Sequence, residues 1–414
     1  MKIAGINNLF VSLHIEGQKF EVGELVHSEQ NIYFRYNSDF LQTGLNLSPI
    51  KLPFNREIIA ADKEPFNGLF GVFNDSLPDA WGRLLLERTL TSKGINIARI
   101  TPLDRLAYLG INGMGALSYQ PEAETQSDFS TMLDLDSIVN ESNRILQGTS
   151  SDIIEELFIL GGSSGGARPK IFVGYNPKTN EIIHGTNNLP EGFQDWIIKF
   201  PSLSDNHEIA NIEYAYHKMA VNAGIEMSEC KLFKGKSGQA YFGTKRFDRV
   251  GNNRLHVHTA SGLMHDNFMV STMDYGHLMD CAFRLEQHVK AYEKIFRLAA
   301  FNVFAHNRDD HSKNFSFLMN AKGEWTFAPA YDLTFSYSSH GFHSTMLAGE
   351  SQNPCKKHLM KLAQHFGLKS GEMIIQEVQC AIKAWGSIAK ECGVNKDNRK
   401  EIKTRMDAIS YRSC

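Results

Sequence analysis

The sequence between residues 295 and 314 places ionisable groups directly beside a segment that looks buried. Residues 295–305, IFRLAAFNVFA, are mostly apolar, whereas residues 306–314 read HNRDDHSKN. Charged side chains are rarely buried unless they are paired or bind a metal. The fold must therefore provide partners for the polar stretch, or the stretch must have a chemical role.

The chain that follows this stretch predicts a β-hairpin. FSFLMN and WTFAPA are short strand-like runs separated by AKGE, and YDLTF comes directly after them. A hairpin returns its second strand beside its first. We therefore expect Asn314, at the entrance of the hairpin, to lie close to Asp332, just past its exit.

Asp309, Asn314 and Asp332 have the order and spacing of a kinase catalytic site. Asp309 and Asn314 form a D-x4-N motif, in which a protein kinase uses the aspartate to accept the hydroxyl proton and the asparagine to hold Mg²⁺. Asp332 would be the second metal-binding acid, and Mg²⁺ prefers such hard oxygen ligands together with phosphate oxygens. The motif alone would favour a hydrated loop before an unrelated hairpin. The preceding Asn307-Arg308 and the hairpin-linked Asp332 favour the kinase interpretation.

A zinc hydrolase is a weaker interpretation of the same stretch. His306 and His311 are separated by five positions, with no HExxH or HxH pattern. A zinc site needs three or four ligands at workable geometry. We expect these histidines to form hydrogen bonds within the loop and to fix its shape.

Residues 161–170, GGSSGGARPK, are a candidate phosphate-binding loop. Its glycines allow backbone N–H groups to approach an anion closely, and Arg168 and Lys170 add positive charge. The loop matches neither the Walker A motif nor G-x-G-x-x-G, so an ordinary glycine-rich turn is the alternative. The apolar strand IFVGY follows it, upstream of the candidate catalytic loop, which is the order that kinases use.

Two further segments could complete a nucleotide site. The strand DWIIKFPS contains Lys199, and the helix predicted over 207–224 carries Glu213 on a half-apolar face, where a carboxylate needs a cation such as Lys199. A solvated Glu213 is the alternative. In YFGTKRFDRV, residues 244–247 would be the hinge whose backbone binds adenine. Asp248 and Arg249 in the same segment are interpreted at least as well by a simple salt bridge as by a direct role in binding.

Bulk properties limit the class of protein. The net charge of −3 and the pI near 6.6 give no whole-chain signal for nucleic acid or an anionic membrane. The N-terminus lacks the features of a signal peptide, and no apolar run is long enough to span a membrane. The six scattered cysteines, without a CxxC pair, are expected to be reduced thiols. These observations predict a soluble cytoplasmic protein.

Six segments occur in the order and spacing of HipA-like serine/threonine kinases, the toxins of HipBA-type toxin–antitoxin modules. They are GGSSGGARPK, DWIIKFP, NIEYAYHKMAVNAG, TKRFDR, NRDDHSKNFSF and PAYDL, of which DDHSKNFS and PAYDL are the most specific. FNDSLPDAWGR and MGALSYQP resemble the N-terminal subdomain of the same family, so the resemblance covers nearly the whole chain. It implies an ATP- and Mg²⁺-dependent protein kinase that inhibits growth and inactivates itself by autophosphorylation. It also implies a protein substrate of the aminoacyl-tRNA synthetase kind and a HipB-like antitoxin with DNA contact through the complex.

The resemblance assigns roles to individual residues. Asp309 would be the catalytic base, Asn314 and Asp332 would bind Mg²⁺, and Glu213 would support Lys199 as an ion pair. Ser163 would be the autophosphorylated residue, with Ser164 as the alternative. The implied ATP-binding residues are Ser164, Gly165, Gly166, Ala167, Arg168, Lys170, Lys199, Thr244, Lys245, Arg246, Phe247, His311 and Lys313. Arg168-Pro169-Lys170 stands where the best-known members carry Gln-Glu-Lys, which puts the nucleotide contacts of this loop in doubt.

The expected fold is α+β: a bilobed protein-kinase-like fold with an N-terminal β-rich subdomain and an all-helical C-terminal lobe. We place an N-terminal subdomain at 1–120, a kinase small lobe at 121–250 and a helical lobe at 251–414. Two alternatives use the same fold. One is a catalytically silent corepressor that acts with a DNA-binding antitoxin, and the other is a small-molecule phosphotransferase. The presence of Lys199, Asp309, Asn314 and Asp332 argues against a silent site.

Overall fold

The computed structural model describes residues 5–122, 134–149, 154–161, 166–185, 188–338 and 341–410. The chain has a mixed α and β fold and divides into two compact units. Unit 1 consists of residues Met1–Asn206, Phe233–His258 and Leu318–Gly323. Unit 2 consists of His207–Leu232, Thr259–Phe317 and Glu324–Cys414.

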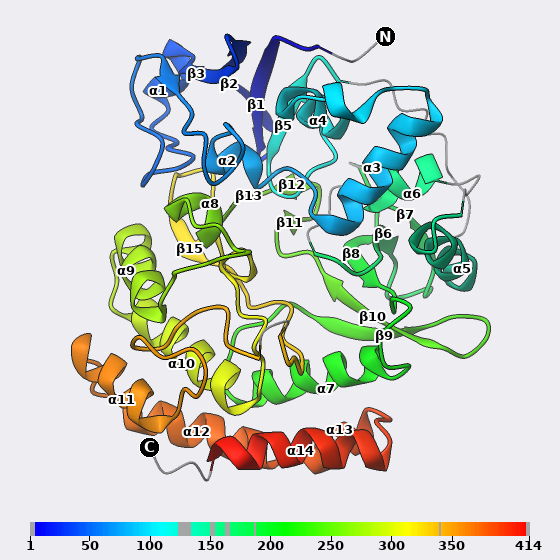
Figure 1. Ribbon diagram of the computed structural model, residues 1–414, viewed down its shortest axis with the longest axis vertical. Helices are drawn as coiled ribbons and strands as arrows, with labels where there is room; N and C mark the ends of the chain where they lie inside the picture. The colour runs from blue at the N-terminus through cyan, green and yellow to red at the C-terminus, as the bar shows by residue number, and fades with distance from the viewer. Residues whose placement is uncertain are drawn as a thin grey trace. The chain divides into compact units, whose positions relative to one another are not determined.

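Unit 1 begins with an antiparallel sheet of order β4-β3-β2-β1-β5 (Figure 1). Its first strand alternates in sequence, so that Leu9, Val11 and Leu13 are buried on one face. This sheet is the β-rich part expected of the N-terminal subdomain. The strands are β1 (Asn8–Ile15), β2 (Gln18–Ser28), β3 (Asn31–Tyr36), β4 (Ile59–Ala60) and β5 (Leu117–Gln120).

Short helices accompany this sheet. One of them, α4, starts with a capping box between Thr101 and Asp104 and has proline at its first position, both strong start signals. The helices are α1 (Ser38–Gln42), α2 (Gly71–Asn74), α3 (Ala80–Ser92), η1 (Ile97–Arg99) and α4 (Pro102–Leu109).

A second sheet has the order β7-β6-β8-β10-β9. Its core contains Tyr175, Trp196 and Phe233, whose rings meet edge to face. The helix α6 packs on both α3 and β6. The elements of this region are α5 (Leu135–Leu146), α6 (Ile154–Gly161), β6 (Lys170–Tyr175), β7 (Ile182–His184), β8 (Gln194–Lys199), β9 (Cys230–Lys234), β10 (Ala240–Lys245), β11 (Arg249–Val250), β12 (Asn253–Arg254) and β13 (His256–Thr259).

Unit 2 is mainly helical, and α10 (Lys290–Phe304) is its central helix. Side chains around most of α10 are buried, as expected for a helix packed against α9, α11, α12 and α14. The other helices are α7 (Ile209–Asn222), α8 (Ala260–Met264), α9 (Tyr275–Glu286), η2 (Ser312–Asn314), α11 (Lys356–His365), α12 (Gly371–Lys383), α13 (Trp385–Glu391) and α14 (Lys396–Ser410).

The predicted hairpin is present, since β14 (Ser316–Met319) is hydrogen-bonded to β15 (Trp325–Phe327). The C-terminal lobe, which was expected to be all-helical, therefore contains strands as well as helices. The pairing follows the sequence pattern, because Phe317, Met319, Trp325 and Phe327 are buried on the two strands.

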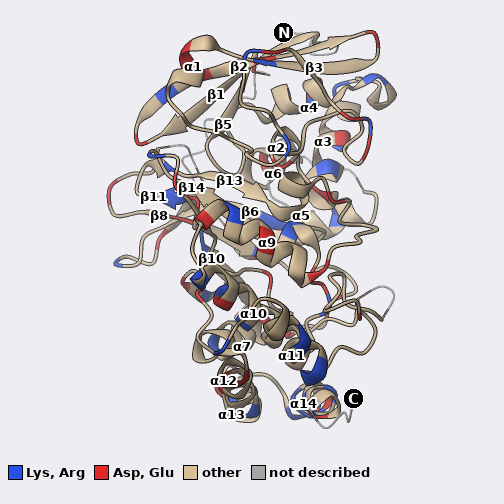
Figure 2. Cartoon of the chain, turned by 90° about the vertical axis from the view of Figure 1, so that its left-hand side faces the viewer, with Lys and Arg blue, Asp and Glu red and all other residues tan. Residues whose placement is uncertain are grey.

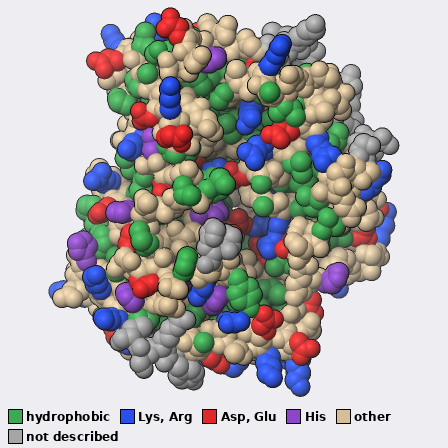
Figure 3. Space-filling view, in the orientation of Figure 1, with side chains coloured by type: hydrophobic (Ala, Val, Ile, Leu, Met, Phe, Trp, Pro, Cys, Tyr) green, Lys and Arg blue, Asp and Glu red, His purple; other side chains and the backbone are tan. Residues whose placement is uncertain are grey.

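Charged residues of both signs are interspersed along the helices of unit 2, as α14 and α12 show in Figure 2. On the face drawn in Figure 3, basic and acidic side chains are likewise mixed rather than gathered by sign. Within the described ranges, no helix has the length and apolar character needed to cross a membrane. Cys230, Cys281, Cys380 and Cys392 are free, whereas Cys355 is disulfide-bonded, so the prediction of six reduced thiols is wrong for Cys355.

Candidate active site

The candidate catalytic loop starts where α10 ends. His306 has a left-handed backbone, with φ of +56°, and this turn carries the chain out of the helix. Its ring lies within hydrogen-bond distance of the Ser336 carbonyl, at 3.1 Å, and stacks on Phe335. Burial, helped by the nearby Arg308, lowers the pKa of His306 to about 4. His306 is thus a neutral residue that shapes the loop, as predicted.

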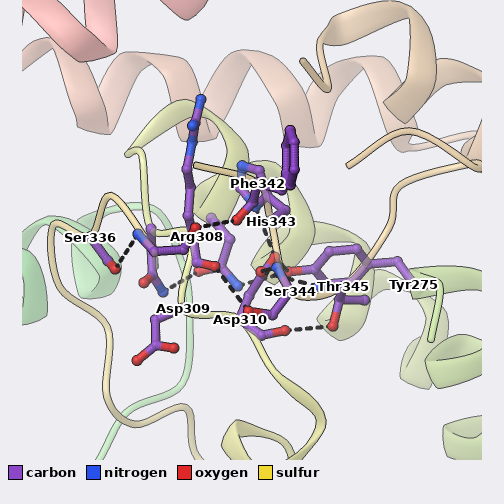
Figure 4. A network of polar contacts seen from close by, with 12 residues as sticks. Tyr275, Arg308, Asp309, Asp310, Ser336, Phe342, His343, Ser344 and Thr345 are labelled. Atoms are coloured by element: carbon purple, nitrogen blue, oxygen red, sulfur yellow. Dashed lines mark hydrogen bonds and ion pairs between the residues drawn. The ribbon is translucent and has the colours of Figure 1, made fainter. Parts of the chain in front are cut away.

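Asp309 and Asp310 are consecutive acids with opposite surroundings (Figure 4). The side chain of Asp309 is 58% exposed, whereas Asp310 is 1% exposed. The Asp310 carboxylate accepts hydrogen bonds from the Tyr275 hydroxyl at 2.8 Å and from the backbone N–H of Ser344 at 2.8 Å. Nδ1 of His343 lies 2.9 Å from the same carboxylate. Asp309 is therefore the acid of this pair that a substrate can reach.

Asn314 is tied to the backbone of Asp309. Its side-chain amide N–H donates to the Asp309 carbonyl at 2.7 Å, and it closes the short helix η2. Because this bond uses the nitrogen of the amide, the amide oxygen is left to act as an acceptor or a metal ligand. The oxygen of Asn314 is the atom that Mg²⁺ would use.

Tyr331 brings the end of the hairpin to the catalytic loop. Its hydroxyl donates to the Lys313 carbonyl at 2.6 Å and lies 2.6 Å from the Ser316 hydroxyl. Tyr331, which precedes Asp332, is thus bonded to Lys313, which precedes Asn314. Asp332 itself has a left-handed backbone with φ of +54°. Such conformations are uncommon outside glycine and often mark functional sites.

His311 and Lys313 pack on an aromatic residue that the sequence analysis did not single out. The Lys313 ammonium lies 4.8 Å from the centre of the Phe268 ring, and the His311 ring lies 5.3 Å from it. The Ser312 hydroxyl between them donates to the carboxylate of Asp266. Nε2 of His311 is 3.8 Å from Oδ1 of Asp309. His311 therefore lies beside the exposed acid, and Lys313 packs on the same aromatic ring as His311.

In unit 1, Lys170 and Lys199 occupy directly opposite positions on β6 and β8. Like charges directly opposite each other in a sheet are unfavourable by themselves, and an anion between them would be favourable. Gly166, with φ of +92°, lies against Lys170, since a Cβ there would be 2.5 Å from the Lys170 ammonium. A side chain at residue 166 would thus displace the lysine.

The described end of the glycine-rich loop is braced by acids of unit 1. The Gly166 N–H donates to Asp79 at 3.1 Å. Arg168 forms a bidentate ion pair with Asp205, at 2.9 and 3.0 Å, so a nucleotide contact from Arg168 would compete with Asp205. Ala167 between them is exposed. The predicted residues Ser163, Ser164 and Gly165 lie outside the described residues.

The predicted hinge begins at the end of β10, where Thr244 and Lys245 pair with β8. Arg246 is buried in a bidentate ion pair with Asp248, at 2.9 and 2.8 Å, and stacks on Phe172. A contact of this hinge with adenine would therefore use the backbone of residues 244–247 rather than the Arg246 guanidinium. Phe247 follows Arg246 and is partly buried.

The predicted salt bridge between Asp248 and Arg249 is present, at 2.7 Å. Burial alone would raise the pKa of Asp248, but the guanidiniums of Arg246 and Arg249 hold this pKa well below its usual range. The Gly115 N–H also donates to Asp248, at 2.7 Å. Asp248 is thus a structural anchor of unit 1.

Glu213 is buried in α7 of unit 2, with 4% of its surface exposed. The alternative of a solvated Glu213 is therefore wrong. Lys199 belongs to unit 1, so its ion pair with Glu213 stays a prediction.

Unit 1 also contains a Ser–His–Asp arrangement that could be mistaken for a hydrolase site. The Ser48 hydroxyl lies 2.9 Å from Nε2 of His258, and Nδ1 of His258 lies 2.6 Å from the Asp75 carboxylate. Ser48 is 1% exposed and His258 is fully buried. A nucleophile must reach its substrate, so this arrangement is structural.

Comparison with known proteins identifies two family domains. The HipA-like C-terminal domain matches residues 162–385, more than half of the chain, and the HipA N-terminal domain matches residues 13–120. No curated protein matches the chain.

Among solved structures, the Shewanella oneidensis MR-1 toxin–antitoxin system HipA, HipB and its operator DNA gives a TM-score of 0.68. The identity is 17%, and the match covers 96% of both chains. This likeness confirms the predicted kinase-like α+β fold. A proinflammatory kinase of Helicobacter pylori, CtkA, gives a TM-score of 0.34 at 12% identity over 52% of this chain and 86% of its own, which is too low to carry an argument.

Proposed function

The chain belongs to the HipA-like family, and from this premise we propose that it is an ATP- and Mg²⁺-dependent serine/threonine protein kinase of the HipA toxin type. The observation that carries the proposal is the pair Asp309 and Asn314. The exposed acid is tied through its own carbonyl to the asparagine that would hold the metal. This arrangement sets a base and a metal ligand at a fixed separation, which phosphoryl transfer requires.

In the proposed reaction, Asp309 accepts the proton of a serine or threonine hydroxyl as the hydroxyl oxygen attacks the terminal phosphorus of ATP. The bond between that phosphorus and the bridging oxygen of ADP breaks, and ADP leaves. Asn314 and Asp332 would hold Mg²⁺, which neutralises phosphate charge when bound. Their oxygen donors fit this ion, because both are hard ligands.

In the same proposal Lys199 and Lys170 contact the phosphates of ATP. Their opposed positions on β6 and β8 support this role, because directly opposite residues share one face of the sheet and would present two cations to the phosphates. Catalysis rests mainly on positioning and charge neutralisation. The backbone of residues 244–247 would receive the adenine.

We further propose that phosphorylation of Ser163, or of its neighbour Ser164, switches the kinase off. A phosphate adds nearly two negative charges beside the nucleotide phosphates. Those charges would repel ATP and would draw the loop toward nearby cations such as Lys170. Mass spectrometry after incubation with ATP and Mg²⁺ tests this idea, and an active enzyme without phosphate on either serine would end it.

The partners proposed for this chain are a HipB-like antitoxin, which would bring DNA contact, and a protein substrate of the aminoacyl-tRNA synthetase kind. The matched Shewanella structure contains HipA together with HipB and operator DNA, which supports the antitoxin. The whole proposal is tested by incubating the protein with labelled ATP and cell extract, with Asp309→Asn as the control. Label on a protein only with the unaltered enzyme is expected. Equal labelling by both would overturn the assignment, and ATP binding without any transfer would favour a silent binding protein.

A further inference from the structure

A closed set of hydrogen bonds surrounds the residue proposed as the base. Asn307, two positions before Asp309, donates from its side-chain amide to the Asn302 oxygen at 2.9 Å. Asn302 donates to the Tyr275 hydroxyl at 2.9 Å, and Tyr275 donates to Asp310 at 2.8 Å. The chain of hydrogen bonds thus starts at Asn307, before Asp309, and ends at Asp310, directly after it. We call these four residues, Asn307, Asn302, Tyr275 and Asp310, the loop clamp.

The hydrogen bonds of the loop clamp run in one direction. A carboxylate only accepts, so the single proton of the Tyr275 hydroxyl goes to Asp310. That hydroxyl then accepts from the Asn302 amide, whose oxygen in turn accepts from Asn307. Burial, with the Asp310 carboxylate close by, raises the pKa of Tyr275 well above its usual value, so the hydroxyl keeps its proton. Removing one atom, the Tyr275 oxygen, breaks the set at its centre.

All members of the loop clamp are buried, none being more than 2% exposed. Hydrogen bonds between buried groups cannot be replaced by water, so losing one leaves an unsatisfied partner and the backbone must move to relieve it. Tyr275 begins α9 and Asn302 lies in the last turns of α10. Two packed helices therefore hold the short loop from both sides.

We propose that Tyr275, Asn302 and Asp310 are positioning residues that hold Asp309 at the place where it accepts the substrate proton. The proposal rests on the kinase function given above. None of the three reaches solvent, so they act through Asp309 and not on the substrate. A displacement of a catalytic group by about 1 Å costs up to ~100-fold in rate.

The same carboxylate also holds the chain that follows Asp332. Asp310 accepts from the backbone N–H groups of Ser344, at 2.8 Å, and Thr345, at 3.3 Å. Arg308, on the other side of Asp309, donates to the Gly341 carbonyl and accepts from the Ser344 N–H at 3.2 Å. Residues 341–345 are therefore fixed to both neighbours of the base (Figure 4). Loss of the loop clamp should loosen this segment together with the loop.

Tyr275→Phe tests the proposal with little change in volume. Tyr119→Phe is the matched control, because Tyr119 is also fully buried and has a hydroxyl contact with Ser76 at 2.7 Å, but belongs to unit 1, whereas the loop belongs to unit 2. Tyr275→Phe should lower kcat by about 10- to 100-fold and leave KM for ATP within about twofold. Tyr119→Phe should leave both constants unchanged at a similar loss of thermal stability. Equal kcat values for the two variants would overturn the proposal.

Hydrogen exchange gives a readout that does not need activity. In Tyr275→Phe the amides of residues 307–310 and 344–345 should exchange at least about tenfold faster, while those of α12 keep their protection. Unchanged exchange in the loop would overturn the loop clamp, even if the variant lost activity. If the unaltered enzyme transfers no phosphate but the loop amides respond as described, the kinase assignment fails and the loop clamp stands.

Discussion

Asp309 projects into solvent, while Asp310, the next residue, is enclosed by polar groups of Tyr275 and of the segment His343–Ser344. The two side chains are chemically identical, so their different surroundings separate a chemical role from a structural one. The same substitution at the two positions should therefore have different results.

Asp309→Asn should leave the fold intact and lower phosphoryl transfer by ~10²–10⁴-fold, because a positioned base is lost. Its melting temperature should match that of the unaltered protein, since an exposed side chain contributes little to stability. The check is the initial rate of label transfer to a protein substrate, measured beside a thermal melt. A variant with full activity would contradict the assignment.

Asp310→Asn should instead lower the free energy of unfolding by about 1–3 kcal/mol, because the new amide N–H group faces donors that need an acceptor. Denaturant titration of both aspartate variants measures this difference. Equal stability of Asp309→Asn and Asp310→Asn would show that the donors around Asp310 do not need its charge.

Lys199→Met should weaken ATP binding, since one of two opposed cations at the phosphates is lost. Calorimetric titration would show a smaller association constant, and the ATP-induced rise in melting temperature would shrink. Lys178→Met is the matched control, because Lys178 lies in the exposed turn after β6. A loss of affinity in both variants would mean that overall charge, and not the position on β8, decides binding.

Glu213→Gln tests the predicted ion pair with Lys199. The pair would orient the lysine, so Glu213→Gln should weaken ATP binding less than Lys199→Met does. A double variant should lose little more than Lys199→Met alone, because the two residues would act together. Glu213→Gln with wild-type binding and turnover would remove the ion pair from the site.

Asp332→Ala should abolish the gain in ATP affinity that Mg²⁺ gives. The four titrations, of the unaltered protein and the variant with and without Mg²⁺, should agree except for the unaltered protein with Mg²⁺, which should bind most tightly. Four equal affinities would contradict the metal ligands proposed at Asn314 and Asp332.

The pH dependence of stability should carry a contribution from His306. Its pKa is about 4 in the fold and near its ordinary value of 6.5 when unfolded, so the unfolded chain binds more protons between these limits. Stability from His306 is present above about pH 6.5 and falls as the pH drops toward 4. Replacing His306 with Gln should flatten the pH profile of the melting temperature in this range. His365→Gln, an exposed position, should not.

The elements that the sequence could predict are those set by the spacing of apolar residues within a single short segment. The hairpin at 316–327 follows from alternating apolar residues around a glycine turn, and the Tyr331 hydroxyl just past it bonds to Lys313. The closeness of Asp332 to Asn314 stays a prediction. The strand that carries Lys199 and the helix that carries Glu213 follow from the same kind of pattern.

Partners from distant segments explain what it could not predict. Tyr275 and His343 lie 35 and 33 positions from Asp310, and no local pattern links them to it. Arg168 looked like a free phosphate ligand in the sequence, but the fold pairs it with Asp205. The role of a cationic side chain near a glycine-rich loop cannot be assigned from sequence until it is known whether an acidic side chain pairs with it.

The buried contacts of His258 have a consequence for dividing this chain. Ser48 and Asp75 lie in the segment that matches the HipA N-terminal domain, and His258 lies in the segment that matches the C-terminal domain. A cut anywhere in residues 123–133 would therefore separate His258 from both of its polar neighbours, and Asp248 from the Gly115 amide. The two family segments therefore share buried polar contacts and are not independent in their folding. Two polypeptides produced from such a cut should reassemble, because each carries half of an interior that water cannot replace.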